Sequence, residues 1–165
     1  MLVFRGKKFS VRVEPVRLPN GKTLMTEGLV KRPGANVIPF VDKDTILLAY
    51  QYRPVVKKWI YQLCGGKIEK DETPIENARK ELEEELGYTA GRMRLIAKFY
   101  TAPHMSNDFQ YIFVATKLKK SWKALEEHEV IKTKRLKLST ALKMIRSGEI
   151  TDATTIAGLL MLRGL

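Results

Sequence analysis

Three of the four glutamates in residues 81–85 are the side chains in this sequence best suited to chemistry. Glu84 and Glu85 follow Glu81 by three and four positions, a spacing that puts side chains on one face of an α-helix. Carboxylate oxygens are ligands that Mg²⁺ prefers, and a bound Mg²⁺ keeps several waters and bridges to substrate phosphates. The cluster therefore predicts a divalent-metal site that acts on a phosphate-containing substrate.

A solvated helix surface laced with ion pairs is the alternative for such a run of charge. It suits part of the helix, where Glu84, for example, has Lys80 four residues before it. Glu81 and Glu85 have no such cation and face each other as like charges. They also lie toward the helix C-terminus, where the helix dipole disfavours negative charge. Because a bound cation would offset both costs, the sequence favours the metal site.

The helix that must carry these glutamates is signalled at both ends. Thr73 is a good N-cap, Pro74 suits the first helical position, and Glu76 completes a capping box. Gly87 is placed to end the helix in a left-handed conformation. We predict a helix over residues 73–86, with an apolar stripe that packs into the core and the glutamates on a different face.

The rest of the chain indicates a mixed α/β protein with a strand-rich first third. Alternating apolar and polar residues on both sides of a Pro-Asn-Gly turn predict a β-hairpin over residues 8–30. Further strands are expected at 35–41, 45–52, 59–64, 94–100, 111–116 and 134–138, and helices at 139–147 and 154–163. An Arg-Pro-Gly sequence ends the hairpin. We therefore predict an N-terminal β-segment, residues 1–34, and a main domain, residues 35–165.

Composition is that of a folded soluble protein. The 165 residues fit one domain with a small appendage, and 44% are hydrophobic and 29% charged. No apolar run approaches the roughly 20 residues that span a bilayer, and the first residues lack the layout of a signal peptide. The single cysteine, Cys64, cannot form an internal disulfide and is expected to be a buried small side chain. These features predict a cytoplasmic protein without membrane contact.

The net charge of +12 indicates an anionic partner, either nucleic acid or a phosphorylated small molecule. The basic residues are scattered, and their densest stretch, residues 117–137, is interrupted by Glu126, Glu127 and Glu129. A stripe that tracks a phosphate backbone would not carry this acidic cluster, and many lysines are also typical of thermophile proteins. The pattern favours a small phosphorylated ligand over nucleic acid.

The segment around the helix resembles the Nudix box, G-x5-E-x7-R-E-U-x-E-E-x-G-U, in which U is aliphatic or aromatic. The matching residues are Gly66, Glu72, Glu81, Leu82, Glu84, Glu85, Gly87 and Tyr88. Lys80 stands where the family has arginine, and because lysine lacks the bidentate fork we expect it to brace a box glutamate more loosely. The resemblance implies a Nudix fold, a mixed β-sheet sandwiched between helices. It also implies a divalent ion, Mg²⁺ with Mn²⁺ as the alternative, and the implied ligands are Glu81, Glu84, Glu85 and the main-chain carbonyl of Gly65.

Segments outside the box resemble the ADP-ribose pyrophosphatase branch of the family. Residues 51–53 are similar to its Q-x-R segment, in which the arginine reaches a substrate phosphate. A proline 15 residues after Tyr88 stands about where the branch has a characteristic proline. The substrate-binding residues implied are Gln51, Arg53, Pro103, His104 and Met105. From the residues alone, a loop histidine without function is the favoured interpretation of His104, and substrate binding is the alternative.

Three further positions follow from the same resemblance. The acidic cluster at 126–129 is similar to a loop that supplies a catalytic glutamate in relatives, which implies Glu127, with Glu129 as second choice, as the group that orients or deprotonates the attacking water. Gln62 departs from the branch, which commonly has a glutamate in the strand before the box. Asp108 lies in a loop where relatives carry acidic residues, and it is a candidate for contact with substrate or metal.

The implied activity is Mg²⁺-dependent hydrolysis of the diphosphate linkage of ADP-ribose to AMP and ribose 5-phosphate, in which Glu85 takes part through the metal. The box does not separate this substrate from NADH, a nucleotide sugar, a dinucleoside polyphosphate or an RNA cap. A non-catalytic nucleotide-binding module is a further alternative, disfavoured because the box glutamates are all present. Two strands alone are marginally stable, and in the branch an N-terminal β-segment crosses to a second subunit, so we expect a homodimer.

Overall fold

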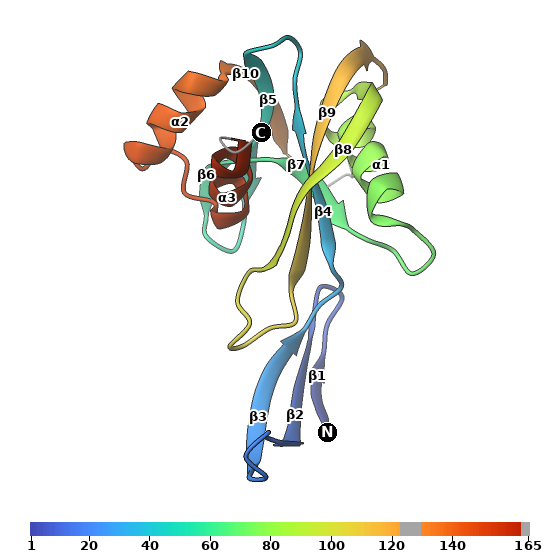
Figure 1. Cartoon of the computed structure of the whole chain (residues 1–165), viewed down its shortest axis with the longest axis vertical. Helices are drawn as coiled ribbons and strands as arrows, with labels where there is room; N and C mark the ends of the chain where they lie inside the picture. Colours follow the sequence, from blue (N-terminus) through green and yellow to red (C-terminus); the bar gives the residue numbers. More distant parts are fainter. Residues whose placement is uncertain (123–129, 163–165) are drawn as a thin grey trace.

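The computed structural model describes residues 1–122 and 130–162 and arranges them in layers of helices and sheets (Figure 1). Helix α1 (Pro74–Leu86) covers one side of the central strands, and α2 (Leu138–Arg146) and α3 (Ala153–Met161) cover the other. A separate small sheet at the N-terminus projects from one end. The predicted α/β layering is confirmed. None of the helices in the described residues is long and apolar enough to cross a bilayer.

The central strands form two sheets that lie between the helices. One is mixed, with the order β7-β4-β9-β8, in which β4 and β9 run parallel. The other is antiparallel, with the order β10-β5-β6. The strands are β4 (Gly34–Pro39), β5 (Thr45–Arg53), β6 (Lys58–Gln62), β7 (Cys64–Lys67), β8 (Tyr88–Tyr100), β9 (Phe109–Lys120) and β10 (Ile131–Lys137). The single strand that we predicted over 59–64 is wrong, because the chain leaves one sheet after β6 and enters the other at β7.

Two hydrophobic cores result from strands that are apolar on both faces. In β5, Leu47 and Ala49 pack in the core beneath α1, whereas Ile46 and Leu48 pack in the core beneath α2 and α3. This alternation follows from the pleat, which turns successive side chains to opposite faces of the sheet. The near-continuous apolar run in β5 therefore reflects burial on both sides and fixes the sheet between the helices.

Helix α1 begins and ends as its sequence predicts. Thr73 is the N-cap, and its side chain and that of Glu76 bond reciprocally to each other's main-chain amides. Gly87 closes the helix in the left-handed region, with φ of 73°. Ala78 and Leu82, on the apolar face of α1, are fully buried in the first core. Anchoring this face fixes the rotation of the helix and thereby the direction of its glutamates.

The N-terminal segment is a three-stranded antiparallel sheet of order β1-β2-β3, comprising β1 (Leu2–Arg5), β2 (Ser10–Arg17) and β3 (Thr23–Val30). The hairpin expected over 8–30 is present as β2 and β3, and β1 adds a strand that we did not predict. Main-chain hydrogen bonds between Leu29 and the loop after β8 tie this sheet to the main domain.

Candidate metal and substrate site

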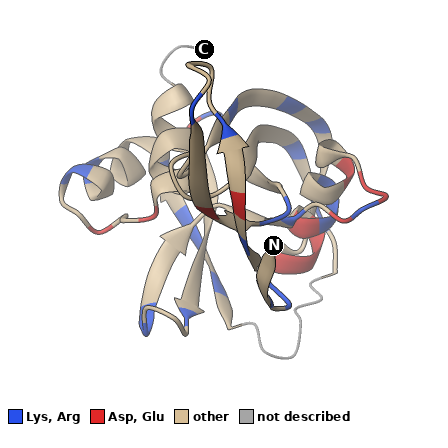
Figure 2. Cartoon of the chain, turned by 90° about the horizontal axis from the view of Figure 1, so that it is seen from below, with Lys and Arg blue, Asp and Glu red and all other residues tan. Residues whose placement is uncertain are grey.

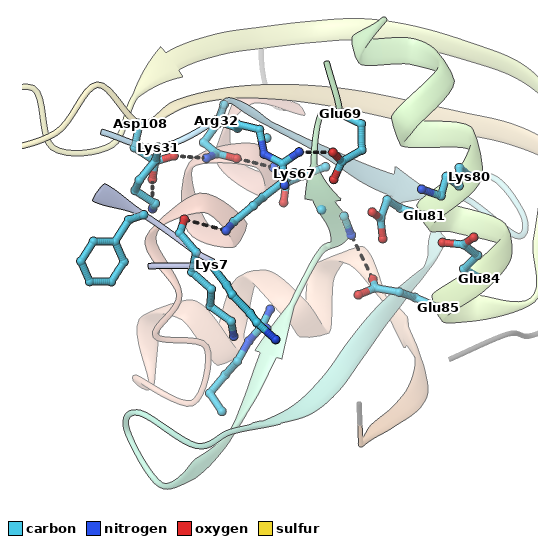
Figure 3. Close-up of a pocket in the computed structure, with 18 residues that line it drawn as sticks. Lys7, Lys31, Arg32, Lys67, Glu69, Lys80, Glu81, Glu84, Glu85 and Asp108 are labelled. Carbon is cyan, nitrogen blue, oxygen red and sulfur yellow. Dashed lines mark hydrogen bonds and ion pairs between the residues drawn. The ribbon is translucent and has the colours of Figure 1, made fainter. Parts of the chain in front are cut away.

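A cavity of about 750 Å³ lies where α1, β7 and the N-terminal segment meet. Its lining combines carboxylates from α1 with cations from several distant parts of the chain (Figure 3). The carboxylates include Glu81, Glu84 and Glu85, and the cations include Lys7, Lys8, Lys31, Arg32, Arg53, Lys67 and Lys80. Viewed from the end that bears the N-terminal sheet, lysine and arginine are spread over the whole chain, and acidic residues occur on the helix and at several other places (Figure 2).

The acidic wall is built on α1 and faces the strand β7. Glu81, Glu84 and Glu85 all line the cavity, and Figure 3 shows them on the same side of it. Glu85 is only 4% exposed, and its Oε2 accepts a hydrogen bond of 2.9 Å from the main-chain amide of Gly65. This bond holds the Glu85 carboxylate against β7.

Two glycines of β7 make room for this wall. A Cβ on Gly65 would overlap the main-chain oxygen of Ala35 and lie 2.8 Å from the Cα of Asn36, on the neighbouring strand β4. A Cβ on Gly66 would overlap the Glu81 carboxylate. Gly65 thus permits the close approach of two strands, and Gly66 leaves the space in which Glu81 lies.

The oxygen donors on this wall fit a hard divalent cation. Three carboxylates line one cavity beside the backbone of Gly65, and oxygen-rich, anionic surroundings are what Mg²⁺ binds. Among the described residues, no three carboxylate, imidazole or thiolate side chains are grouped closely enough to hold a metal ion in their present conformations. The glutamate side chains lie on one helix and rotate about their side-chain bonds, so they could converge on an ion without movement of the backbone.

The opposite side of the cavity is rich in cations, of which Lys31 pairs with Asp108 and Arg32 with Glu69. Lys7, Lys31, Arg32 and Lys67 lie across from the glutamates (Figure 3). Nζ of Lys67 donates to the main-chain carbonyl of Lys8 at 2.7 Å, which connects β7 to the loop between β1 and β2. Burial and the positive charge of Arg32 and nearby lysines lower the pKa of Lys67 below its ordinary value. An anionic group in the cavity would relieve this mutual repulsion.

Lys80, which replaces the family arginine, pairs with the box residue Glu72 rather than with a glutamate four residues along the helix. The Nζ–Oε1 distance is 3.4 Å, longer than a strong charge-assisted hydrogen bond. Partial burial acts to lower the pKa of Lys80, but Glu72 and the other nearby carboxylates outweigh it and raise that pKa above its ordinary value. Lys80 therefore stays charged at the rim of the acidic wall, with a loose contact of the kind expected for lysine.

A buried asparagine on α1 fastens the loop that precedes the helix. Asn77 is fully buried, and its Nδ2 donates to the main-chain oxygen of Lys67 and to Oε2 of Glu72, both at 2.9 Å. Hydrogen bonds from the main chain of Glu69 and from Asn77 lower the pKa of Glu72 below its ordinary value. Asn77 thus fixes both ends of the loop between β7 and α1.

A chain of hydrogen bonds connects the N-terminal segment to β4. Nζ of Lys31 donates to Oδ2 of Asp108 at 2.7 Å, Asp108 accepts from Gln110 at 2.8 Å, and Gln110 accepts from Asn36 at 2.8 Å. All four residues line the cavity. Asp108 is thereby engaged in organising the wall on which Lys31 lies.

The structure brings some of the predicted site residues together and separates others. Arg53 lines the same cavity as the box glutamates and Gly65. Gln51 is buried within β5 and does not line that cavity. Pro103, His104 and Met105 line a second cavity of about 480 Å³ beside β3. Glu127 and Glu129 lie outside the described residues.

Cys64 is buried next to the acidic wall, as expected for a small core residue. It is fully buried, and burial together with the charges of Glu85 and Glu81 raises its pKa well above the ordinary value of a thiol. Because the thiolate is the nucleophilic form, Cys64 is unsuited to nucleophilic chemistry.

Sequence reasoning missed most of the basic wall and the asparagines. Lys7, Lys31 and Lys67 come from three separate segments and had no motif to mark them. Asn36 and Asn77 carried a usable signal, because Asn77 is a polar residue on the buried face of its helix and Asn36 is the one polar residue of an otherwise apolar strand. Buried polar groups require partners and so often mark built sites.

Comparisons with known proteins agree with this geometry. Residues 30–157 match the NUDIX domain family. The chain is 38% identical over 156 residues to a protein named ADP-ribose pyrophosphatase from Bacillus subtilis (strain 168), covering 93% of this chain and 84% of that protein. It is 36% identical over 157 residues to a protein named methanol dehydrogenase activator from Bacillus methanolicus, covering 93% and 84%.

A solved structure described as an ADP compounds hydrolase shares the fold. It superimposes with a TM-score of 0.87 at 23% identity, covering 99% of this chain and 89% of that one. The family match spans most of the sequence and includes the helix with its glutamates. The chain therefore belongs to the Nudix family and is a Nudix pyrophosphohydrolase.

Proposed function

We propose that this protein hydrolyses the diphosphate linkage of ADP-ribose, giving AMP and ribose 5-phosphate. The observation that carries the proposal is the division of one cavity into an acidic wall on α1 and a basic wall opposite it. A diphosphate with a divalent cation presents both charges at once, so it complements both walls. The volume of about 750 Å³ lies in the range of small-molecule sites, about 300–1,000 Å³. The similarity to the Bacillus subtilis protein supports ADP-ribose within this substrate class.

The carboxylates of the acidic wall are proposed to hold Mg²⁺, with Mn²⁺ as the alternative. The proposed ligands are Glu81, Glu84, Glu85 and the carbonyl of Gly65. When bound, the ion would neutralise diphosphate charge and lower the pKa of a water. Glu85 is held in place within this group, since the amide of Gly65 already orients its carboxylate.

The chain's own cations would bind and orient the diphosphate. Arg53 is proposed to contact a phosphate, because a guanidinium suits the paired oxygens of a phosphate. Lys7 and Lys67 would place further positive charge in the same cavity. Glu127, or Glu129 as second choice, is proposed to orient or deprotonate the attacking water. Gln51, Pro103, His104 and Met105 remain proposed substrate contacts, and the last three would require a substrate that extends toward the second cavity.

A substrate panel tests the proposal. Purified protein would be incubated with Mg²⁺ and ADP-ribose, NADH, a nucleotide sugar, a dinucleoside polyphosphate or capped RNA, and the phosphate-containing products identified by mass spectrometry. We expect the highest kcat/KM with ADP-ribose and release of AMP. A clear preference for another member of the panel would replace ADP-ribose as the substrate. No metal-dependent turnover of any member would refute the enzymatic proposal.

We also propose that residues 1–34 form the contact of a homodimer. Residues 1–34 expose eight large apolar side chains, namely Met1, Leu2, Val3, Phe4, Phe9, Val16, Leu24 and Met25. Such a concentration on one small sheet is typical of an interaction surface. Light scattering at micromolar concentration should give twice the monomer mass, and Phe4→Glu should reduce it. Val55→Glu, in an exposed turn far along the chain, is the matched control, and a wild-type monomer would contradict the proposal.

A further inference from the structure

A line of three polar side chains connects the cavity to the start of α3. Nε of Arg53 donates to Oε1 of Gln62 at 2.5 Å, and Nε2 of Gln62 donates to Oδ1 of Asp152 at 2.8 Å. Arg53 ends β5, Gln62 ends β6, and Asp152 is the N-cap of α3. The line therefore joins three elements, although Gln62 and Asp152 are 90 residues apart in the sequence.

Asp152 is a fixed end for this line. Its Oδ2 accepts from the amide of Thr155 at 2.9 Å and from the hydroxyl of Thr155 at 2.7 Å. Thr155 is fully buried, and its hydroxyl also accepts from the amide of Leu63 at 3.0 Å. One oxygen of Asp152 is thus committed to the helix cap and the other to Gln62.

The middle position requires both a hydrogen-bond acceptor and a donor. Arg53 only donates, and the Asp152 carboxylate only accepts. A glutamine amide offers an oxygen to the first and an NH₂ group to the second. The glutamate common at this position in relatives would serve Arg53 but would meet Asp152 with a second carboxylate, and like charges in contact repel.

We propose that Gln62 is a positioning residue that holds the guanidinium of Arg53 against the cap of α3, with its terminal nitrogens directed to a substrate phosphate. This inference rests on the proposed function, in which Arg53 binds phosphate. The bond to Gln62 engages Nε, so Nη1 and Nη2 meet the phosphate. Gln62, which replaces the glutamate common in relatives, and the carboxylate of Asp152 thus form one matched pair of donor and acceptor.

A double-mutant cycle tests the pairing. Gln62→Glu alone places a carboxylate at residue 62 next to that of Asp152. Asp152→Asn alone leaves amides at residues 62 and 152, with no carboxylate to fix the direction of the hydrogen bonds from Arg53. The double variant Gln62→Glu/Asp152→Asn restores the order, because the introduced carboxylate accepts from Arg53 while the introduced amide donates to that carboxylate and still caps α3. It also keeps the net charge of the three residues. Asparagine is as good an N-cap as aspartate, so the helix should form in every variant.

Each single variant should lower kcat/KM for ADP-ribose by about tenfold or more, the loss expected for a hydrogen bond to a charged group. The loss should appear mainly in KM, because phosphate binding is affected and the metal ligands are not. The double variant should regain activity to within about threefold of wild type, the residual expected when one matched pair replaces another. A double variant whose loss equals the product of the single losses would overturn the proposal.

An NMR measurement gives a readout that does not depend on activity. The Nε–H signal of Arg53, assigned by its disappearance in Arg53→Lys, should be resolved and protected from solvent exchange in the wild type. Gln62→Leu should remove that protection, and the double variant should restore it. An unchanged signal in Gln62→Leu would overturn the bridge. If the wild type fails to hydrolyse ADP-ribose while these signals behave as described, the proposed substrate fails and the positioning of Arg53 stands.

Discussion

Glu81 lies in the space that a side chain on Gly66 would occupy, so the residue that makes room for this glutamate of the proposed metal site is a glycine on the strand opposite the helix. The neighbouring Gly65 has a different task. A side chain there would collide with the main chain of β4, at Ala35 and Asn36. One glycine therefore serves the site, and the next serves the packing of two strands.

Alanine at these two glycines should separate binding from stability. Gly66→Ala displaces only the flexible end of Glu81, so the free energy of unfolding should change by less than about 1 kcal/mol while Mg²⁺ affinity falls. Gly65→Ala forces backbone atoms apart and should destabilise the fold by about 1–3 kcal/mol or more. Urea unfolding and calorimetric titration with Mg²⁺ measure the two effects. A Gly66→Ala protein that binds Mg²⁺ as tightly as wild type would contradict the role given to Glu81.

Glu85→Gln should abolish most metal-dependent turnover without unfolding the protein. The amide oxygen can still accept from Gly65, so the local fold is retained, but one anionic ligand is lost. We expect kcat at a fixed Mg²⁺ concentration to fall by about 100-fold. The control is Glu76→Gln on the same helix, where glutamine also completes a capping box. Equal activity in both variants would show that Glu85 is not a ligand.

Local signals made α1 predictable from the sequence. Thr73, Pro74, Glu76 and Gly87 each act within a few residues of the helix ends, and the observed boundaries follow them. The layering of sheets and helices was implied by the resemblance to the Nudix box, and the run of β5, which is buried on both faces, agrees with it. These features depend on neighbours in sequence, which sequence reasoning can see.

The features that were missed depend on residues far apart in the chain. The strand predicted over 59–64 breaks because the amide of Leu63 bonds to Thr155 in α3 instead of continuing the ladder. The basic wall gathers Lys7 and Lys67 from segments that no local pattern relates. Gln62 was visible only as a departure from a family pattern, and its reason appears once Asp152 is beside it.

Asn77→Ala should destabilise the protein and loosen the loop before α1. The change leaves the main-chain oxygen of Lys67 and one oxygen of Glu72 without the donor that they now share. The loss of partners for such groups costs about 1–3 kcal/mol. Chemical unfolding measures the cost, and hydrogen exchange at residues 68–72 measures the loosening. A control at the exposed Ile75 of the same helix, Ile75→Ala, should leave exchange in this loop unchanged, and equal exchange in both variants would contradict the assigned role.

Asp42 should make an acid-sensitive contribution to stability far from the cavity. A main-chain hydrogen bond from Asp44, together with bonds from Thr45, lowers its pKa from 3.8 to about 2. Because the folded protein binds this proton less readily than the unfolded chain, the contribution is fully present above about pH 4. It is lost as the pH falls from about 4 through about 2, where the folded-state carboxylate becomes protonated.

The variant Asp42→Asn tests this contribution, because its side-chain amide can still accept hydrogen bonds from the turn but cannot titrate. The difference in unfolding free energy between wild type and Asp42→Asn, measured with urea at several pH values, should therefore be constant near pH 5 and shrink toward pH 2. A difference that does not change with pH would show that the charge of Asp42 does not stabilise this turn.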